Sequence, residues 1–161
     1  MVELTLPVVL QLVQTTALLV GIFYYIMTLR NSKKSRDAQI FLQFSNRMGS
    51  EKWQNGIKHF SELEFSNYQD FEKYRDNNPE ELSDIRYVLS LLEDFGGLVR
   101  GGYLDISIIA YTTFSPIKLV WEKLLPVKDE WRTKVPRMWS EIEYLYDQLH
   151  LYKQKNPKLF K

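Results

Sequence analysis

A run without any charged residue, from Leu4 to Leu29, constrains this chain more than any other feature. At a rise of about 1.5 Å per residue, a helix from Val8 to Leu29 would cross a hydrocarbon core about 30 Å thick. The only charge before the run is Glu3, and no small-x-small cleavage site follows, so a secretory signal peptide fits poorly. A buried helix of a soluble protein is rarely this long without a polar face. The run therefore predicts an N-terminal tail and transmembrane helix over residues 1–30.

Basic residues follow the run, and none precedes it. They are Arg30, Lys33, Lys34 and Arg36, with Asp37 as the acid beside them. By the positive-inside rule, this asymmetry places the N-terminus outside the cell membrane and the C-terminal part in the cytoplasm. The basic residues belong to a predicted juxtamembrane helix over residues 31–50, where they should contact anionic lipid headgroups at about 1 kcal/mol each.

The predicted span carries a polar stripe near its outer end. Gln11, Gln14 and Thr15 are three and four residues apart, so they share one face of a helix. One interpretation is that these side chains bind a partner helix of another integral-membrane subunit, at about 0.6–2 kcal/mol per hydrogen bond. The alternative is that the two glutamines simply reach the headgroup region. We favour the partner helix, because the side chains lie on one face.

Residues 51–161 have the helical spacing of an all-α bundle. Ser50 is a candidate N-cap for a helix that carries Trp53, Ile57 and Phe60 on one face. The sequence Asn78-Pro79-Glu80-Glu81 is typical of a helix start, and Gly101-Gly102 of a helix end. The expected fold is therefore one N-terminal transmembrane helix followed by a cytoplasmic bundle of about five or six helices.

Two prolines and one acid set the expected boundaries in the last third of the chain. Asp105 is a candidate N-cap, and Pro116 should kink or break the helix that follows it. Pro136 is expected to open the last helix, in which residues from Trp139 to Tyr152 form a broad apolar stripe.

Composition argues against much enzyme chemistry. The chain has no cysteine, which excludes disulfides, thiolate metal sites and cysteine nucleophiles. Its two histidines, His59 and His150, are too few for a histidine-rich metal centre and have the sequence surroundings of partly buried residues. The net charge is +1, and the many aromatic residues are not interleaved with Arg and Lys, so nucleic acid is not an expected partner. We expect no catalytic site, cofactor or metal, and therefore no enzyme.

Glu93, Asp94 and Arg100 form the set that most resembles an active site. Glu93 and Arg100 are seven residues apart and share a helix face, whereas Asp94 points about 100° away from Glu93. Acid–base catalysis would require a cleft and shifted pKa values. An ion pair that stabilises the fold is the better interpretation of this set.

Three segments resemble a family of small, single-pass prokaryotic membrane proteins of unknown function. They are AQIFLQFSNRM (38–48), LLEDFGGLVRGGYLD (91–105) and VWEKLLPVKDEWR (120–132). The resemblance implies a span, a basic junction and an all-helical cytoplasmic domain. It implies no catalytic residues, because the family has none assigned.

Two functional hypotheses follow. In the first, the protein is a non-enzymatic accessory or scaffold subunit of a larger membrane complex, and one candidate complex is an archaeal membrane oxidase or ammonia-oxidising enzyme. In the second, it is a membrane-tethered signalling or regulatory domain that binds a soluble partner or a small ligand. A pocket lined by aromatic side chains with convergent polar groups would favour the second hypothesis, and a large exposed apolar patch on the bundle would favour the first.

Overall fold

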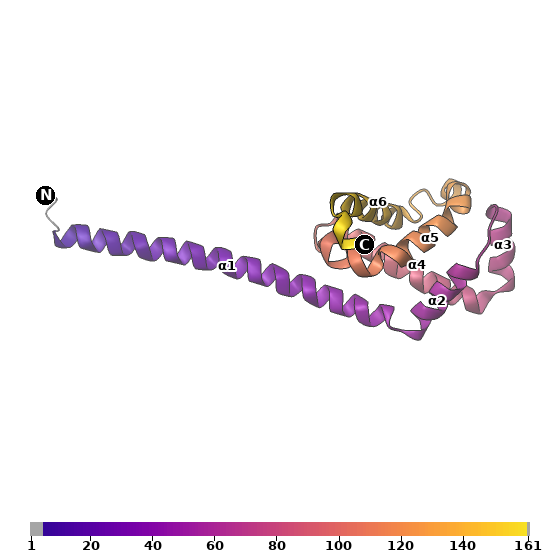
Figure 1. The fold of residues 1–161 in the computed structure, drawn as a ribbon, viewed down its shortest axis with the longest axis horizontal. Helices are drawn as coiled ribbons and strands as arrows, with labels where there is room; N and C mark the ends of the chain where they lie inside the picture. The colour runs from indigo at the N-terminus through magenta and orange to yellow at the C-terminus, as the bar shows by residue number, and fades with distance from the viewer. Residues whose placement is uncertain (1–4, 161) are drawn as a thin grey trace. The chain divides into compact units, whose positions relative to one another are not determined.

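The computed structural model describes residues 5–160, and every regular element in that range is helical (Figure 1). Six α-helices and one short 3₁₀ helix follow one another along the chain. They are α1 (Leu6–Met48), α2 (Glu51–Glu62), α3 (Tyr68–Asn77), α4 (Pro79–Arg100), α5 (Ile106–Lys134), α6 (Ser140–Lys155) and η1 (Pro157–Phe160). The predicted all-α class, with one long apolar N-terminal helix followed by a helical region, is confirmed.

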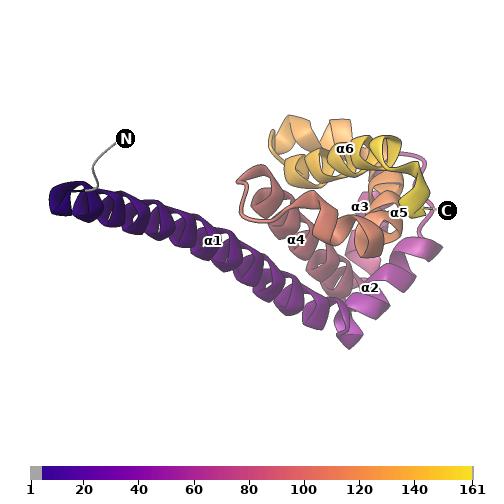
Figure 2. The same ribbon diagram turned by 60° about the vertical axis from the view of Figure 1, so that its left-hand side comes forward.

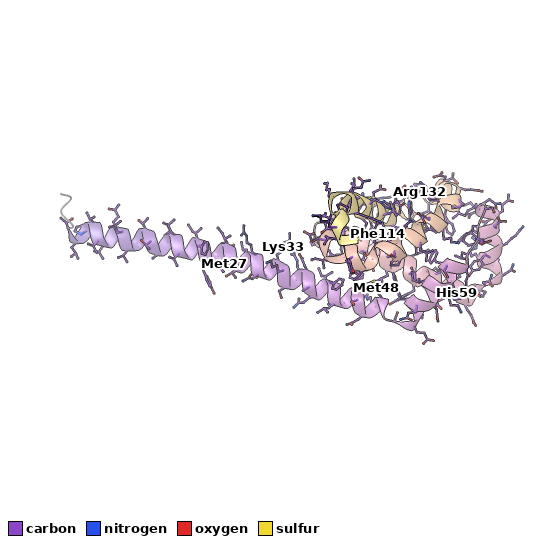
Figure 3. The ribbon with its side chains drawn as sticks, viewed as in Figure 1. Met27, Lys33, Met48, His59, Phe114 and Arg132 are labelled. Carbon is purple, nitrogen blue, oxygen red and sulfur yellow. The ribbon has the colours of Figure 1, made fainter. Side chains whose placement is uncertain are left out.

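The chain divides into two units between Gln39 and Ile40. The first unit holds most of α1, a continuous helix of 43 residues, about 65 Å long at the standard rise. It is the one helix within the described residues that is long and apolar enough to cross a membrane, and none of its most apolar stretch is buried in the protein. Its side chains project all round the helix, as Met27 and Lys33 do in Figure 3.

The second unit is the bundle, made of the last turns of α1 and helices α2 to α6. The helix α4 lies at its centre, because α4 packs along both α2 and α6, and α5 packs against α6 (Figure 2). Fully buried side chains from these helices share one core. Among them are Phe60 on α2, Phe95 on α4, Ile117 on α5 and Leu145 on α6.

Local signals set several helix ends as expected. The Ser50 hydroxyl accepts the N–H of Trp53 at 3.3 Å, and the Asp105 carboxylate accepts the N–H of Ser107 at 2.9 Å. At the end of α4, Gly102 adopts φ +70°, and the N–H of Tyr103 bonds back to the carbonyl of Leu98 at 2.9 Å. That pattern closes a helix where a residue without a Cβ takes the left-handed conformation.

Of the two outcomes expected at Pro116, a kink or a break, the break is wrong, since α5 runs through both Pro116 and Pro126. A proline within a helix costs about 3 kcal/mol, and the fully buried Ile109, Ile117 and Val120 on either side of Pro116 supply apolar burial that offsets this cost.

Pro136 does not open the last helix either. Residues 135–139 form a turn, and α6 begins at Ser140. Trp139 has φ 57° and ψ 25°, so its backbone is left-handed and cannot continue into an α-helix. The indole of Trp139 is nevertheless buried, and its burial stabilises the turn.

Candidate functional site

The bundle contains a pocket of about 250 Å³ between α3, α4, the end of α5 and the turn before α6. Its lining is mainly apolar and aromatic, with four polar side chains. The lining residues are Phe71, Arg75, Leu82, Ile85, Arg86, Leu89, Ser90, Glu93, Trp131, Met138 and Trp139. Pockets of this kind, with a few polar groups on an apolar wall, are typical of small-molecule sites.

Three aromatic rings form one wall of the pocket. The rings of Phe71 and Trp131 lie 4.8 Å apart at 68°, and those of Trp131 and Trp139 lie 5.2 Å apart at 49°. Trp139 is the one residue other than glycine with positive φ within the described chain. Such a conformation costs about 1–2 kcal/mol for a residue with a Cβ, so the surrounding packing holds this indole in the wall against local strain.

Glu93 provides a carboxylate at the pocket. The backbone N–H groups of Glu141 and Ile142, in the first turn of α6, face this carboxylate and act to lower its pKa. Its Oε1 atom is buried and has no hydrogen-bond partner. Burial, as the largest cause, nevertheless raises the pKa of Glu93 above its ordinary value. Glu93 therefore lies beside the start of α6 and keeps Oε1 free to accept a donor.

Two arginines line the same pocket. Arg75 is paired with Asp76 at 2.9 Å and with Glu72 at 3.8 Å. Arg86 is exposed, and its guanidinium has no ion-pair partner among residues 5–160. An arginine without a partner at a pocket mouth is suited to bind a carboxylate or phosphate, since its fork of N–H donors matches their oxygens.

A third arginine, Arg132, lies in the last turn of α5 (Figure 3). Arg132 Nε donates to the carbonyl of Met138 at 3.0 Å, and its Nη1 lies 2.8 Å from Glu143 Oε2. Burial alone would raise the pKa of Glu143, but hydrogen bonds from Arg132 and Lys128 lower it below its ordinary value. Arg132 thus fixes the turn that carries Met138 and adds positive charge near Glu93.

The residues predicted to contact a partner helix or lipid all lie exposed on α1. They are Gln11, Gln14, Thr15, Arg30, Lys33, Lys34 and Arg36. The Thr15 hydroxyl donates to the carbonyl of Gln11 at 2.8 Å, so its donor is already satisfied within the helix. The two glutamine side chains are therefore the ones left to bind another helix, and the proposed contacts of all seven residues stay predictions.

The expected ion pair between Glu93 and Arg100 is replaced by contacts between helices. Arg100 Nε lies 2.7 Å from Glu141 Oε2, and its Nη2 donates to the carbonyl of Ser140 at 3.1 Å. Asp94 instead lies 3.9 Å from Arg47. Arg100 binds the first turn of α6 and Glu93 faces that turn, so the two residues meet α6 and do not pair with each other.

The two histidines are partly buried, as expected. His59 Nδ1 lies 3.6 Å from Glu81 Oε2, which also accepts the Tyr74 hydroxyl at 2.6 Å. The ring of His150 lies 4.3 Å from that of Tyr146. Within residues 5–160, no group of three or more His, Asp or Glu side chains is placed to hold a metal ion.

Sequence reasoning missed the pocket itself. Arg86, Ser90 and Glu93 are spaced by four and three residues, so they form a polar column on a helix face that also carries Leu82 and Leu89. That column was the one feature of the sequence that indicated the pocket. The turn that carries Met138 and Trp139 could not be anticipated, because Pro136 indicated a helix start there.

The structure thus defines an all-α protein with one helix long enough to span a membrane and a bundle that holds an aromatic pocket. The chain belongs to the family described as a domain of unknown function, DUF4760, which matches residues 11–149. This match confirms the predicted resemblance to a family of unknown function. No match was found among curated proteins or among solved structures.

Proposed function

We propose that the protein is a single-pass membrane protein whose cytoplasmic bundle binds a small ligand, and that it works as a membrane-tethered regulatory or signalling domain. The observation that carries the proposal is the pocket on α3, α4 and α5, where Arg86, Ser90 and Glu93 line the same space as an aromatic wall. Anchoring rests on the apolar length of α1. Ligand binding, and not catalysis, is the activity proposed for the bundle.

The exposed apolar residues of the bundle give less support to a subunit interface. The large ones come from different elements and are Leu42, Tyr103, Tyr111, Leu125, Val135, Leu151 and Leu159. Two of them, Tyr111 and Leu159, line one open recess together with Lys153. Apolar side chains scattered singly over a surface are ordinary in soluble domains.

A second candidate function is the accessory subunit of a membrane complex. It is favoured by Gln11 and Gln14, whose amide groups lie exposed on one face of α1. In hydrocarbon, such groups find partners on another helix. The two proposals are compatible, since one concerns the span and the other concerns the bundle.

A ligand screen on the full-length protein in detergent tests the main proposal. Thermal unfolding would be followed with a library of polar and amphipathic metabolites. Ser90→Trp would fill the pocket, and Ser83→Trp is the matched control, because Ser83 is also exposed on α4 but does not line the pocket. We expect at least one compound to stabilise the natural protein and Ser83→Trp but not Ser90→Trp. Stoichiometric integral-membrane partners without any ligand whose effect depends on Ser90 would overturn the proposal in favour of the second candidate.

Orientation can be tested with single cysteines, because the chain has none of its own. Thr5 and Ser66 are both exposed, one before the span and one in the bundle. In intact cells, a maleimide that does not cross membranes should label Thr5→Cys and leave Ser66→Cys unlabelled. The reverse pattern would place the pocket outside the cell.

A further inference from the structure

We propose that the pocket binds a small aromatic carboxylic acid that carries a neutral hydroxyl at its far end. In this arrangement Arg86 holds the carboxylate, the wall of Trp131 and Trp139 packs against the ring, and Glu93 Oε1 accepts the hydroxyl hydrogen. The inference rests on the proposed ligand-binding function and assigns the chemical class of the ligand. Each part follows from one feature of the pocket.

The two polar ends of the pocket are set by one helix. Arg86 and Glu93 both line the pocket and are separated by seven residues of α4, about 10 Å along the helix axis. Ser90 lies between them on the same face, and Leu89 adds an apolar surface. A ligand that uses both ends is therefore elongated, with its acid and its donor at opposite ends.

The donor end should be neutral. Glu93 Oε1 is buried and has no hydrogen-bond partner, and a ligand hydroxyl would supply one. An ammonium group would also donate, but the positive charge of Arg132 already acts on Glu93. A second cation at this end would be repelled by that guanidinium. A hydroxyl meets the acceptor without that repulsion.

The middle of the ligand should be flat and apolar. The rings of Trp131 and Trp139 lie 5.2 Å apart and at 49°, next to Phe71, so the wall presents both faces and edges. Aromatic groups pack against such walls in stacked or edge-to-face arrangements. The volume of about 250 Å³ admits one ring with a short chain and excludes a lipid with a full acyl tail.

The first probe is para-hydroxyphenylpropionate, whose hydroxyl and carboxylate are separated by one ring and a short chain. Two analogues each remove one end: phenylpropionate lacks the hydroxyl, and para-hydroxyphenylpropanol lacks the carboxylate. Binding to full-length protein in nanodiscs would be measured by calorimetry. We expect each analogue to bind at least about tenfold more weakly than the probe, because each loses a hydrogen bond to a charged group.

Variants then assign each end to a residue. Arg86→Gln should abolish the preference for the acid over the alcohol, and Glu93→Gln should reduce the preference for the hydroxylated acid to a few-fold. The matched controls are Arg137→Gln and Asp94→Asn, which change exposed residues outside the pocket. Both control variants should still prefer the acid over the alcohol and the hydroxylated acid over phenylpropionate.

The outcomes separate the two proposals. If the probe and its analogues bind equally, while some other compound is blocked by Ser90→Trp, the ligand class is wrong and the ligand-binding function stands. If no compound loses its effect in Ser90→Trp, the ligand-binding function is wrong, and the ligand class is wrong with it. Because Glu93 also faces the first turn of α6, circular dichroism on Glu93→Gln would confirm folding. The discrimination lost in Arg86→Gln tests the same inference without disturbing that contact, and unchanged discrimination there would overturn it.

Discussion

Replacing Gly96 with alanine should destabilise the bundle, because the backbone of α6 occupies the space that the new methyl group needs. A Cβ at Gly96 would lie 2.2 Å from the carbonyl oxygen of Glu141 and 2.5 Å from its carbonyl carbon. Both are backbone atoms, so no side-chain rotation can relieve the contact. The helices α4 and α6 would have to separate.

The size of the effect can be worked out by comparison with the next residue. Gly97 is also within α4, but a Cβ there meets nothing within 4 Å. Replacing a helical glycine with alanine stabilises by about 0.5–1 kcal/mol, and overpacking a core costs about 1–3 kcal/mol. Gly97→Ala should therefore stabilise the bundle, whereas Gly96→Ala should fall about 2 kcal/mol below it, because both share the helical gain and only Gly96→Ala overpacks. For a bundle of this size, that gap is a difference in Tm of roughly 10 °C.

Tryptophan fluorescence during thermal or urea unfolding of the full-length protein is the natural assay. All four tryptophans, at positions 53, 121, 131 and 139, belong to the bundle, so the signal does not report on α1. The expected order of Tm is Gly97→Ala, natural protein, Gly96→Ala. If the two variants had equal stability, the close approach of α4 and α6 would be refuted.

Three other sets of substitutions should change stability or helix association in a direction that the structure predicts. The pKa of Glu93 is raised in the folded protein. Its contribution to the free energy of unfolding is therefore complete below its ordinary pKa and is lost as pH rises through the raised value. In urea titrations, the stability advantage of the natural protein over Glu93→Gln should shrink as pH rises. The pKa of Glu143 is lowered, so its contribution to the free energy of unfolding is complete above its ordinary pKa and is lost as pH falls through the lowered value. The stability advantage of the natural protein over Glu143→Gln should therefore grow as pH rises. If stability depended on pH in the same way in both variants, both assignments would be contradicted. In the span, Gln11→Leu with Gln14→Leu should weaken helix association measured by energy transfer in vesicles, while Thr15→Val should change it little, because the Thr15 hydroxyl already bonds within α1.

Local chemistry predicted much of the fold, and it failed where tertiary packing opposed it. Ser50 and Asp105 cap their helices through contacts within three residues, which sequence spacing specifies directly. Pro116 is a strong local signal for a break, but the burial of its neighbours on α5 outweighs it. Pro136 lies in a turn because Trp139 adopts a left-handed backbone and Arg132 holds the carbonyl of Met138. No spacing rule contains that information.

The candidate site was less predictable, because its residues come from distant parts of the chain. Glu93 and Arg100 were expected to pair with each other, but the groups that each one faces lie at least 40 residues later, in the first turn of α6. The aromatic wall combines Phe71 on α3 with Trp131 on α5. Periodicity assigns residues to a helix face, and it does not say which helix covers that face.

The close approach at Gly96 links the stability of the bundle to its pocket. Gly96 and Glu93 are three residues apart and share a face of α4, so the contact at Gly96 brings the first turn of α6 against the Glu93 carboxylate. The Oε1 atom of that carboxylate is buried and has no hydrogen-bond partner. A change that separates α4 from α6 should therefore displace both Glu93 and Trp139. Gly96→Ala should weaken ligand binding even at temperatures where the variant remains folded, and Gly97→Ala should leave binding unchanged.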